Sequence, residues 1–225
     1  MIPKTIQTKI DEGRQFRSFD VSSFERRTSD SGEKIVEGYA TTFNQPYELY
    51  RDALGDGITY IVKEQIDAGA FEDCDMSDVI MQYNHEGRVF ARRSNGTLKI
   101  STDGHGLHIR ADLSGTEIGR QLYEEIEGGY TDKMSFGFRV SEDKRDETEV
   151  RDAETGLRTI TILRTITKIS KLYDVSAVAL PANDATSISA RSFCEGVIEE
   201  TKKEFLAREQ RERQKKKIKI LLEVT

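Results

Sequence analysis

The sequence GGYTDKMSFGF, residues 128–138, contains a helix end and a strand around which the rest of the chain is organised. A helix-like segment ends at the double glycine, and a strand follows. Successive side chains of a strand point to opposite faces, so the large apolar residues share one face: Met134, Phe136 and Phe138. Ser135 and Gly137 share the other face, where a small hydroxyl beside a glycine leaves an open patch for another backbone. Ser135 is therefore a candidate nucleophile.

A serine is weakly nucleophilic unless a base activates it, and the chain contains three histidines. His85 follows the apolar run 79–84, which predicts a buried strand, so its ring stands at a strand end where side chains meet loops. His105 and His108 flank the turn of a hairpin predicted over 97–113 and are expected to be exposed. His85 is the candidate general base, although the ordinary role of a lone histidine is structural.

Asp174 lies inside an apolar strand predicted over 171–180. Aspartate is depleted from strand interiors, and a buried carboxylate is unfavourable unless it is paired or hydrogen-bonded. An imidazole N–H is one partner that would satisfy it. The alternatives are a position on the open face of the sheet, or a bond to an arginine such as Arg139 or Arg164, and the sequence leaves them open.

These residues form a Ser–His–Asp arrangement in the chain order His85, Ser135, Asp174. His85 would take the proton of Ser135 and later give it to the leaving amine, while Asp174 would fix the tautomer and stabilise the imidazolium. No Gly-x-Ser-x-Gly elbow surrounds the serine, which disfavours a hydrolase of the α/β type. No metal-ligand spacing and no phosphate-binding glycine loop is present, so the sequence predicts neither a metal nor a cofactor.

The composition is that of a polar protein, with 36% hydrophobic and 33% charged residues in a chain of 225. No apolar run approaches the ~20 residues that cross a bilayer, so we expect no membrane segment. Residues 1–20 lack an apolar signal core, and the two cysteines, Cys74 and Cys194, make no disulfide framework. Both features favour a reduced, cytosolic location. The net charge of −6 argues against general affinity for nucleic acid.

Predicted strands follow one another along most of the chain, with one amphipathic helix at 115–127. This pattern predicts a mostly β, α+β fold: a closed or nearly closed, mostly antiparallel barrel with helices packed outside. The expected organisation is a flexible N-terminus at 1–14, a β-barrel domain at 15–193 and a charged helical tail at 194–225. The apolar stripe of the tail is thin, so we expect a helix outside the core, either a tether or a plain solvated helix.

Segments between the strands are expected to be irregular or helical. Residues 44–57 predict a loop, because they contain Asn-Gln-Pro and Gly-Asp-Gly. Residues 63–73 contain helix formers and predict one or two turns. Residues 141–156 are almost wholly charged and favour a solvated hairpin tip or a disordered loop over a specific binding role. Ser114 is the expected N-cap of the helix, with Glu117 at capping-box spacing.

Four motifs follow one another between residues 33 and 190: EGYA with FN (37–40, 43–44), MQYNH (81–85), KMSFGF (133–138), and DVS with PAN (174–176, 181–183). Their content and order resemble the prohead proteases of tailed bacteriophages. These are capsid-maturation serine proteases related to the herpesvirus assemblin proteases. Four motifs in one order make the resemblance specific.

The resemblance implies a closed antiparallel β-barrel surrounded by helices, as in the herpesvirus proteases. It assigns the nucleophile to Ser135, the general base to His85 and the acidic third position to Asp174. The phage branch usually has Glu at the third position, and the herpesvirus branch uses a second histidine. The residue that orients His85 therefore stays open between Asp174 and a histidine, His105 or His108.

The resemblance also implies what the protein does. Such proteases enter the immature capsid, or prohead, in the host cytoplasm, cleave the scaffolding segment from the major capsid protein, and cut themselves into fragments that escape. We therefore expect a serine endopeptidase whose partners are the capsid protein and itself, with no nucleic acid or membrane partner. The herpesvirus relatives dimerise, and a homodimer stays open here.

Two other functions remain open at this point, a non-catalytic capsid assembly factor with the same barrel and a small esterase. For the tail at 194–225, we hypothesise a removable helix that docks on scaffold helices and places the enzyme inside the shell.

Overall fold

The structure, a computed structural model, describes residues 8, 12–20, 25–28, 32–54, 57–178 and 184–223. Most of the predicted N-terminal segment 1–14, and all of the motif at 181–183, lie outside these residues. The fold is mostly β with helices, which confirms the predicted α+β class.

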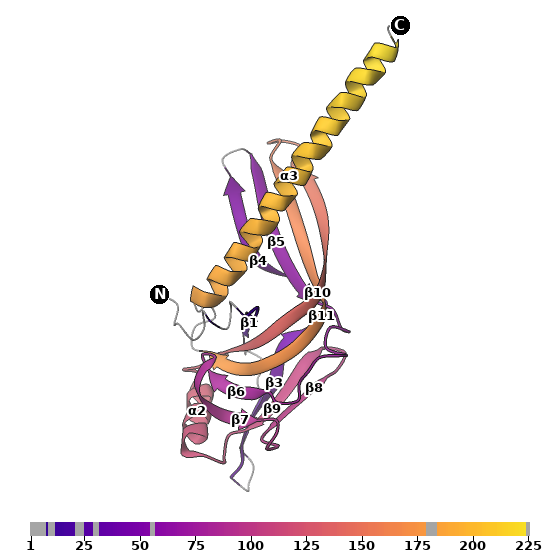
Figure 1. Ribbon diagram of the computed structural model, residues 1–225. Coiled ribbons are helices and arrows are strands. Elements are labelled where there is room, and N and C mark those ends of the chain that lie inside the picture. The colour runs from indigo at the N-terminus through magenta and orange to yellow at the C-terminus, as the bar shows by residue number, and fades with distance from the viewer. Residues whose placement is uncertain are drawn as a thin grey trace.

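The strands form two sheets. The larger has seven strands, in the order β1 (Gln15–Asp20), β10 (Lys133–Arg151), β11 (Arg158–Val178), β5 (Ile58–Ile66) and β4 (Tyr47–Leu54), with β6 (Ile80–Tyr83) on β11 and β7 (Glu86–Arg92) on β6. The smaller has four, in the order β2 (Glu25–Thr28), β3 (Lys34–Thr42), β9 (Gly106–Asp112) and β8 (Leu98–Thr102). Helices α2 (Glu117–Glu127) and α3 (Asp184–Glu223) complete the fold (Figure 1).

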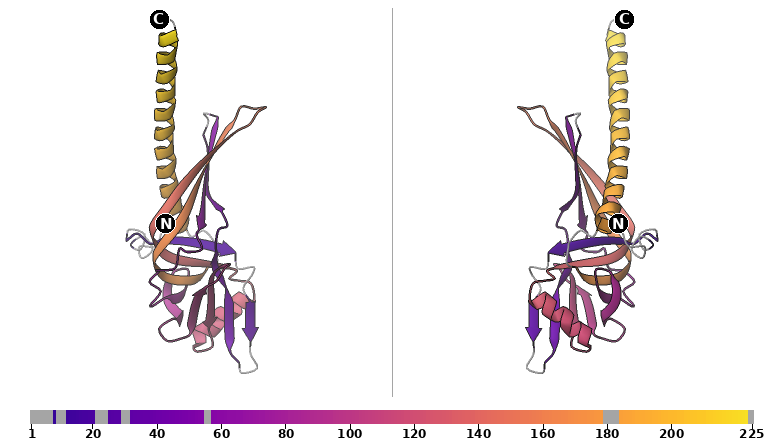
Figure 2. Two further views of the ribbon diagram at one scale, coloured as in Figure 1. Left: turned by 90° about the vertical axis from the view of Figure 1, so that its right-hand side faces the viewer. Right: turned by 90° about the vertical axis from the view of Figure 1, so that its left-hand side faces the viewer.

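The closed barrel expected from the sequence is wrong for the described residues, because no strand of the larger sheet pairs with a strand of the smaller one. The long strand β11 explains why. Its C-terminal part pairs with β6 in the body, but residues 158–166 pair with β5, which carries β4. These strands build an arm that projects from the body instead of a wall that closes it (Figures 1 and 2). Both of these β11 pairings are parallel, whereas the other ladders between strands are antiparallel, as expected.

Several segments expected to be loops or helical turns are strands. Residues 47–54, inside the predicted loop, form β4, and residues 63–66, predicted as helical turns, complete β5. The charged segment at 141–156 is only in part a hairpin tip, because β10 continues to Arg151 and pairs with β11 along its length. In each case the backbone hydrogen bonds of a partner strand determine the structure, and local composition does not report them.

Helix α2 confirms the amphipathic pattern at 115–127, with a different start. Thr116 is the N-cap in place of the expected Ser114, and its hydroxyl accepts a hydrogen bond from the N–H of Gly119. The apolar side of the helix is buried, as its spacing predicts: Leu122, Tyr123 and Ile126. This side faces the main core, which also draws side chains from both sheets.

Helix α3 begins earlier than the predicted tail, and its first part is not outside the core. Its buried residues recur at helical spacing: Ala190, Cys194, Val197, Ile198 and Thr201. A second, smaller core forms where this stripe meets the arm at Tyr60, Val62, Ile160 and Ile162. Beyond Phe205 the described side chains are exposed, and this part of the helix extends past the hairpins of the arm (Figure 2).

Candidate functional site

Ser135 lies on β10 in the body of the molecule. Ser18 of β1 stands opposite it on one side, and Ser176 of β11 stands opposite it on the other. The apolar side chains of the strand enter the core as predicted, with the rings of Phe136 and Phe138 stacked 4.5 Å apart. The face of Ser135, however, is not the open patch expected, because the residue is completely buried.

His85 is presented by the tight turn between β6 and β7. Asn84 and His85 have positive φ angles, 50° and 62°, and Tyr83 pairs with Glu86 across the turn. Two successive residues with positive φ are typical of a type I′ turn, and Asn and His are among the non-glycine residues that adopt this conformation most readily. The N–H of Asn84 also donates to the carbonyl of Ala177 on β11, over 3.0 Å. This bond ties the turn to the strand that carries Asp174.

The ring of His85 lies between Ser135 and Asp174. Its Nε2 is 2.6 Å from Oγ of Ser135, and its Nδ1 is 2.5 Å from Oδ1 of Asp174. A carboxylate only accepts hydrogen bonds, so Nδ1 carries a proton, and whenever the ring is neutral Nε2 presents a lone pair to the serine. The structure therefore connects three side chains that the sequence places 50 and 89 positions apart.

Asp174 is buried and held from several sides. The Ser176 hydroxyl donates to Oδ1 over 2.8 Å, and Nη1 of Arg14 lies 3.6 Å from Oδ2. Burial by itself raises the pKa of Asp174, but the charge and hydrogen bond of His85, followed by Ser176 and Arg14, hold it below its ordinary value. The carboxylate is therefore ionised at neutral pH and suited to stabilise a protonated His85 ring.

Gly137 is required by a close approach. It stands opposite Asp174 in the β10–β11 ladder. A Cβ atom at this position would lie 2.4 Å from Oδ2 of Asp174 and 3.0 Å from Cε1 of Phe16. The space beside the serine, which the sequence assigned to an approaching backbone, is thus occupied by the carboxylate and by a phenyl ring.

The other candidates for the third position lie elsewhere. His105 is exposed and His108 is half-buried, and their rings contact Tyr39, with centroids 4.5 and 5.1 Å from it. Arg139 and Arg164, the alternative partners of the aspartate, hydrogen-bond to other groups. Of the groups that the sequence proposed around the aspartate, the structure brings His85 to it.

Sequence reasoning missed the supporting roles of Ser176, Arg14 and Phe16. The i, i+2 spacing of Asp174 and Ser176 on one face of a strand was a usable signal. Arg14 and Phe16 had no such signal, because they precede or open the first strand and reach the site only through the pairing of β1 with β10. The Phe16 ring packs on His85, with centroids 4.4 Å apart.

A pocket of about 540 Å³ lies next to the site, between the β6–β7 hairpin and α2. Asn84 and Glu86, the chain neighbours of His85, line it together with Arg88. Gln121 and Glu125 of α2 line the opposite side. Apolar side chains, Phe90, Ile118 and Leu122, complete the lining. The pocket therefore combines an apolar lining with charges of both signs, and begins where the His85 turn ends.

The thiols offer no rival nucleophile. Cys74 and Cys194 are both free, and burial raises the pKa of each to about 11, so both stay protonated at neutral pH. Within the described part of the chain, no group of three or more His, Cys, Asp or Glu side chains is placed to hold a metal ion. No helix of this part is both long and apolar enough to cross a bilayer.

Among the comparisons with known proteins, a family model matches most of the chain. A family model described as Caudovirus prohead serine protease matches residues 21–204, a range that contains His85, Ser135 and Asp174 and leaves β1 outside. No curated protein matches the chain. A solved structure, that of the bacteriophage T4 capsid assembly protease gp21, is similar with a TM-score of 0.38 and 11% identity, over 73% of this chain and 96% of that chain.

Proposed function

Since the chain belongs to the caudovirus prohead serine protease family, we propose that it is a serine endopeptidase that cleaves the scaffolding segment of the phage major capsid protein. Membership itself makes the protein a protease that acts inside the phage capsid in the host cell. The proposal adds the substrate, cleavage of the chain by itself, and the residues that perform the reaction.

The observation that carries the proposal is the position of His85, whose two ring nitrogens lie within 2.6 Å of Ser135 Oγ and Asp174 Oδ1. In the reaction, Oγ of Ser135 attacks the carbonyl carbon of the scissile peptide while Nε2 of His85 takes the hydroxyl proton. The same nitrogen then gives the proton to the leaving amine, and water repeats the sequence on the acyl-enzyme. Asp174 fixes the Nδ1–H tautomer and stabilises the charged ring.

The pocket beside the His85 turn is the proposed place for a side chain of the substrate. Glu86 and Glu125 favour a basic side chain, and Arg88 favours an acidic one at a second position. Charges of both signs discriminate between peptides by attracting one sign of side chain and repelling the other. A charged scaffolding segment is a suitable substrate for such a pocket.

The exposed end of α3 is the proposed docking element. Beyond Phe205 its described side chains are charged or polar with a few apolar exceptions. They contribute to neither of the two hydrophobic cores. A solvated helix with charges of both signs can pair with a scaffold helix through exposed ion pairs and a thin apolar stripe. This element would bring the enzyme into the shell before maturation.

The test is co-expression of the chain with its capsid protein, followed by intact-mass analysis of both. Wild type should yield a shortened capsid protein and fragments of the protease. Ser135→Ala should yield neither, and Asp174→Asn should slow cleavage by about 10⁴-fold, because the wrong tautomer then faces the serine. Ser141→Ala is the matched control, since Ser141 lies on the same strand but is exposed, and it should behave as wild type.

Identical masses for wild type and Ser135→Ala would reject the protease. They would leave the non-catalytic assembly factor as the function. Turnover of soluble esters without cleavage of the capsid protein would instead identify an esterase.

A further inference from the structure

The strand β1 covers the site described above. It lies at the edge of the larger sheet, antiparallel to β10, with Ser18 opposite Ser135. Ser135 and Asp174 have 0% exposure and His85 has 3%, so no reactive atom is open to solvent. A peptide carbonyl must come within about 3–3.5 Å of the nucleophile before it can react. In this form of the molecule it cannot.

Each residue of the site is covered by a different residue at or near β1. The carbonyl oxygen of Arg17 lies 2.9 Å from Oγ of Ser135. The ring of Phe16 lies on His85, and the guanidinium of Arg14 reaches Asp174. An extended segment that runs along β10, with a carbonyl beside the serine, is the arrangement that a bound substrate peptide adopts.

The Arg17 carbonyl also competes for the proton that the reaction needs. A hydroxyl carries one proton, and the Ser135 hydroxyl donates it to the carbonyl of Arg17. Nε2 of His85, which lies 2.6 Å away, is a second acceptor for the same proton. While β1 is in place, the serine is covered and the Arg17 carbonyl competes with His85 for its proton.

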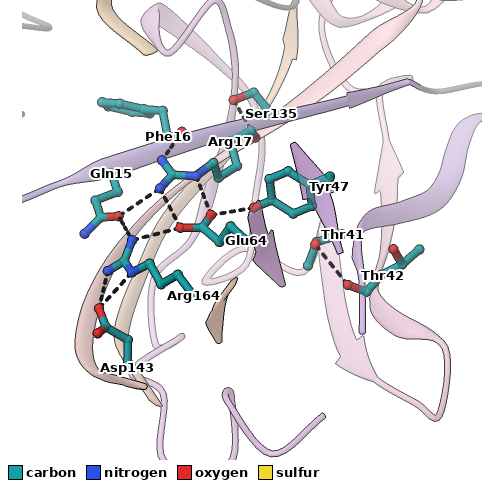
Figure 3. A network of polar contacts seen from close by, with 10 residues as sticks. All are labelled: Gln15, Phe16, Arg17, Thr41, Thr42, Tyr47, Glu64, Ser135, Asp143 and Arg164. Atoms are coloured by element: carbon teal, nitrogen blue, oxygen red, sulfur yellow. Dashed lines mark hydrogen bonds and ion pairs between the residues drawn. The ribbon is translucent and has the colours of Figure 1, made fainter. Parts of the chain in front are cut away.

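The side chain of Arg17 fastens β1 to the rest of the molecule. Its Nε and Nη2 donate to the two carboxylate oxygens of Glu64, over 2.6 and 2.9 Å, in a buried fork (Figure 3). Gln15 bridges Arg17 to Arg164, which also binds Glu64. Side-chain hydrogen bonds to Glu64 and backbone pairing with β10 thus both hold β1 in place.

The family match begins just after this strand. The matched region begins at residue 21, directly after β1, and contains every residue of the site. The strand that covers the site therefore lies outside the residues that the family model matches.

We propose that β1 occupies the place of the substrate strand, and that an extended peptide reaches Ser135 only by replacing β1 at the edge of β10. The inference rests on the proposed function, since it takes Ser135 as the nucleophile. In the described form the protease is latent. Its substrate binds by antiparallel strand addition, with one residue in the position of Arg17 and its carbonyl at the serine.

A reversible disulfide between β1 and β10 tests this exchange. Asp20 and Lys133 are Cα partners at the end of the ladder. Partners in an antiparallel ladder lie about 4.5–5.5 Å apart, which is within the range that a disulfide spans. The double variant Asp20→Cys/Lys133→Cys is compared in oxidised and reduced form, with Lys133→Cys alone and wild type as controls for the oxidation itself.

The first readout is labelling of the full chain by a fluorophosphonate, in which Oγ bonds to phosphorus, fluoride leaves and His85 takes the proton. The second readout is hydrogen exchange of the β1 amides, which does not depend on catalysis. We expect the oxidised double variant to lose labelling to the level of Ser135→Ala, and its β1 amides to exchange more slowly. Reduction should restore both, and the controls should not change.

Equal labelling of the oxidised and reduced double variant would overturn the inference and leave the proposed function intact. Loss of labelling in every form, with β1 exchange still released by reduction, would reject Ser135 as nucleophile while supporting the opening of the strand. Loss of labelling together with unchanged exchange would reject both.

Discussion

At the level of single side chains, the site depends on close approaches that leave little room for change. Gly137, Asp174 and Phe16 meet at one point beside Ser135. Each of them is buried, and Asp174 is held by hydrogen bonds from His85 and Ser176. A change at this point must therefore move a group that takes part in the proposed reaction.

Gly137→Ala is expected to reduce activity strongly while the chain still folds. The new Cβ would lie 2.4 Å from Oδ2 of Asp174, so the carboxylate must shift and its bond to His85 must lengthen. A displacement of about 1 Å at a catalytic group costs about 10²-fold in rate. The measurement is the rate of cleavage of the capsid protein, with circular dichroism to confirm folding. Gly196→Ala is the matched control, since a Cβ there meets nothing within 4 Å, and activity equal to wild type for Gly137→Ala would contradict the geometry.

The acid stability of the protein is expected to depend on Asp174. Its pKa is lower in the folded chain than in the unfolded chain, where it is about 3.9. Its charged form therefore stabilises the fold above that value, and this contribution is lost as pH falls through the lower, folded value. Asp174→Asn removes this titration.

The measurement is the free energy of unfolding of wild type and Asp174→Asn from pH 7 to pH 2. The gap between the two proteins should be constant at neutral pH and should narrow below about pH 4. A gap that stays constant down to pH 2 would show that the folded-state pKa of Asp174 is not lowered.

At the level of elements, the β6–β7 turn takes its conformation from its own residues, whereas the packing of helix α3 depends on strands distant in the sequence. The conformation of the turn is local, since Asn84 and His85 with positive φ project the ring. Helix α3 needs the arm, because its buried stripe has no partner until β5 and β11 lie side by side. The helix therefore consists of a packed first part and a solvated second part.

Two truncations are expected to separate these parts of α3. Ending the chain after Phe193 removes Val197 and Ile198, and burial of such a side chain contributes about 1.5–3 kcal/mol, so stability should fall by about 3 kcal/mol or more. Beyond Gln210, every side chain that the structure describes is exposed. Ending the chain after Gln210 should therefore leave Tm unchanged. Thermal unfolding of both, with encapsidation as a second readout, tests the assignment.

The Gln210 truncation also tests the docking proposal without the loss of stability. Loss of encapsidation with peptide cleavage intact would support a docking helix. Unchanged encapsidation would reject it, and an equal fall in Tm for both truncations would contradict the division of the helix.

At the level of the whole molecule, a buried ionic network joins four strands of the larger sheet. Glu64 of β5 accepts from Arg17 of β1, Arg164 of β11 and Tyr47 of β4, and the last bond is 2.5 Å long (Figure 3). Burial raises the pKa of Glu64, but the charges and hydrogen bonds of Arg17, Arg164 and Tyr47 hold it below its ordinary value. The network fixes the arm, the body and β1 relative to one another.

Glu64→Ala is expected to destabilise the protein by about 3–5 kcal/mol, because it leaves two buried guanidinium groups without their shared partner. Glu48→Ala is the matched control, since Glu48 pairs with Arg51 on the exposed surface of β4. It should leave the free energy of unfolding nearly unchanged. Urea unfolding measures both, and similar losses for the two variants would contradict a buried network.

The sequence alone predicted those helices and strand faces that follow from the periodicity of their own side chains. Alternation placed Met134, Phe136 and Phe138 in the core, and i, i+4 spacing identified the helix at 115–127. The residue types around Ser135, His85 and Asp174, and their similarity to one family, named the same three side chains that the structure brings together. These signals need no knowledge of what lies across the sheet.

Pairing between distant strands was beyond the reach of such signals. Tyr47–Leu54 forms a strand because β5 offers hydrogen bonds, and the charged residues 141–151 do so because β11 lies alongside. The open arm, the packed start of α3 and the cover that β1 makes over Ser135 arise in the same way. Backbone hydrogen bonds and the register of a ladder are non-local, because they depend on a partner strand that lies elsewhere in the sequence. That is why the residues alone could name the three side chains that meet, whereas their burial followed only from the assembled sheet.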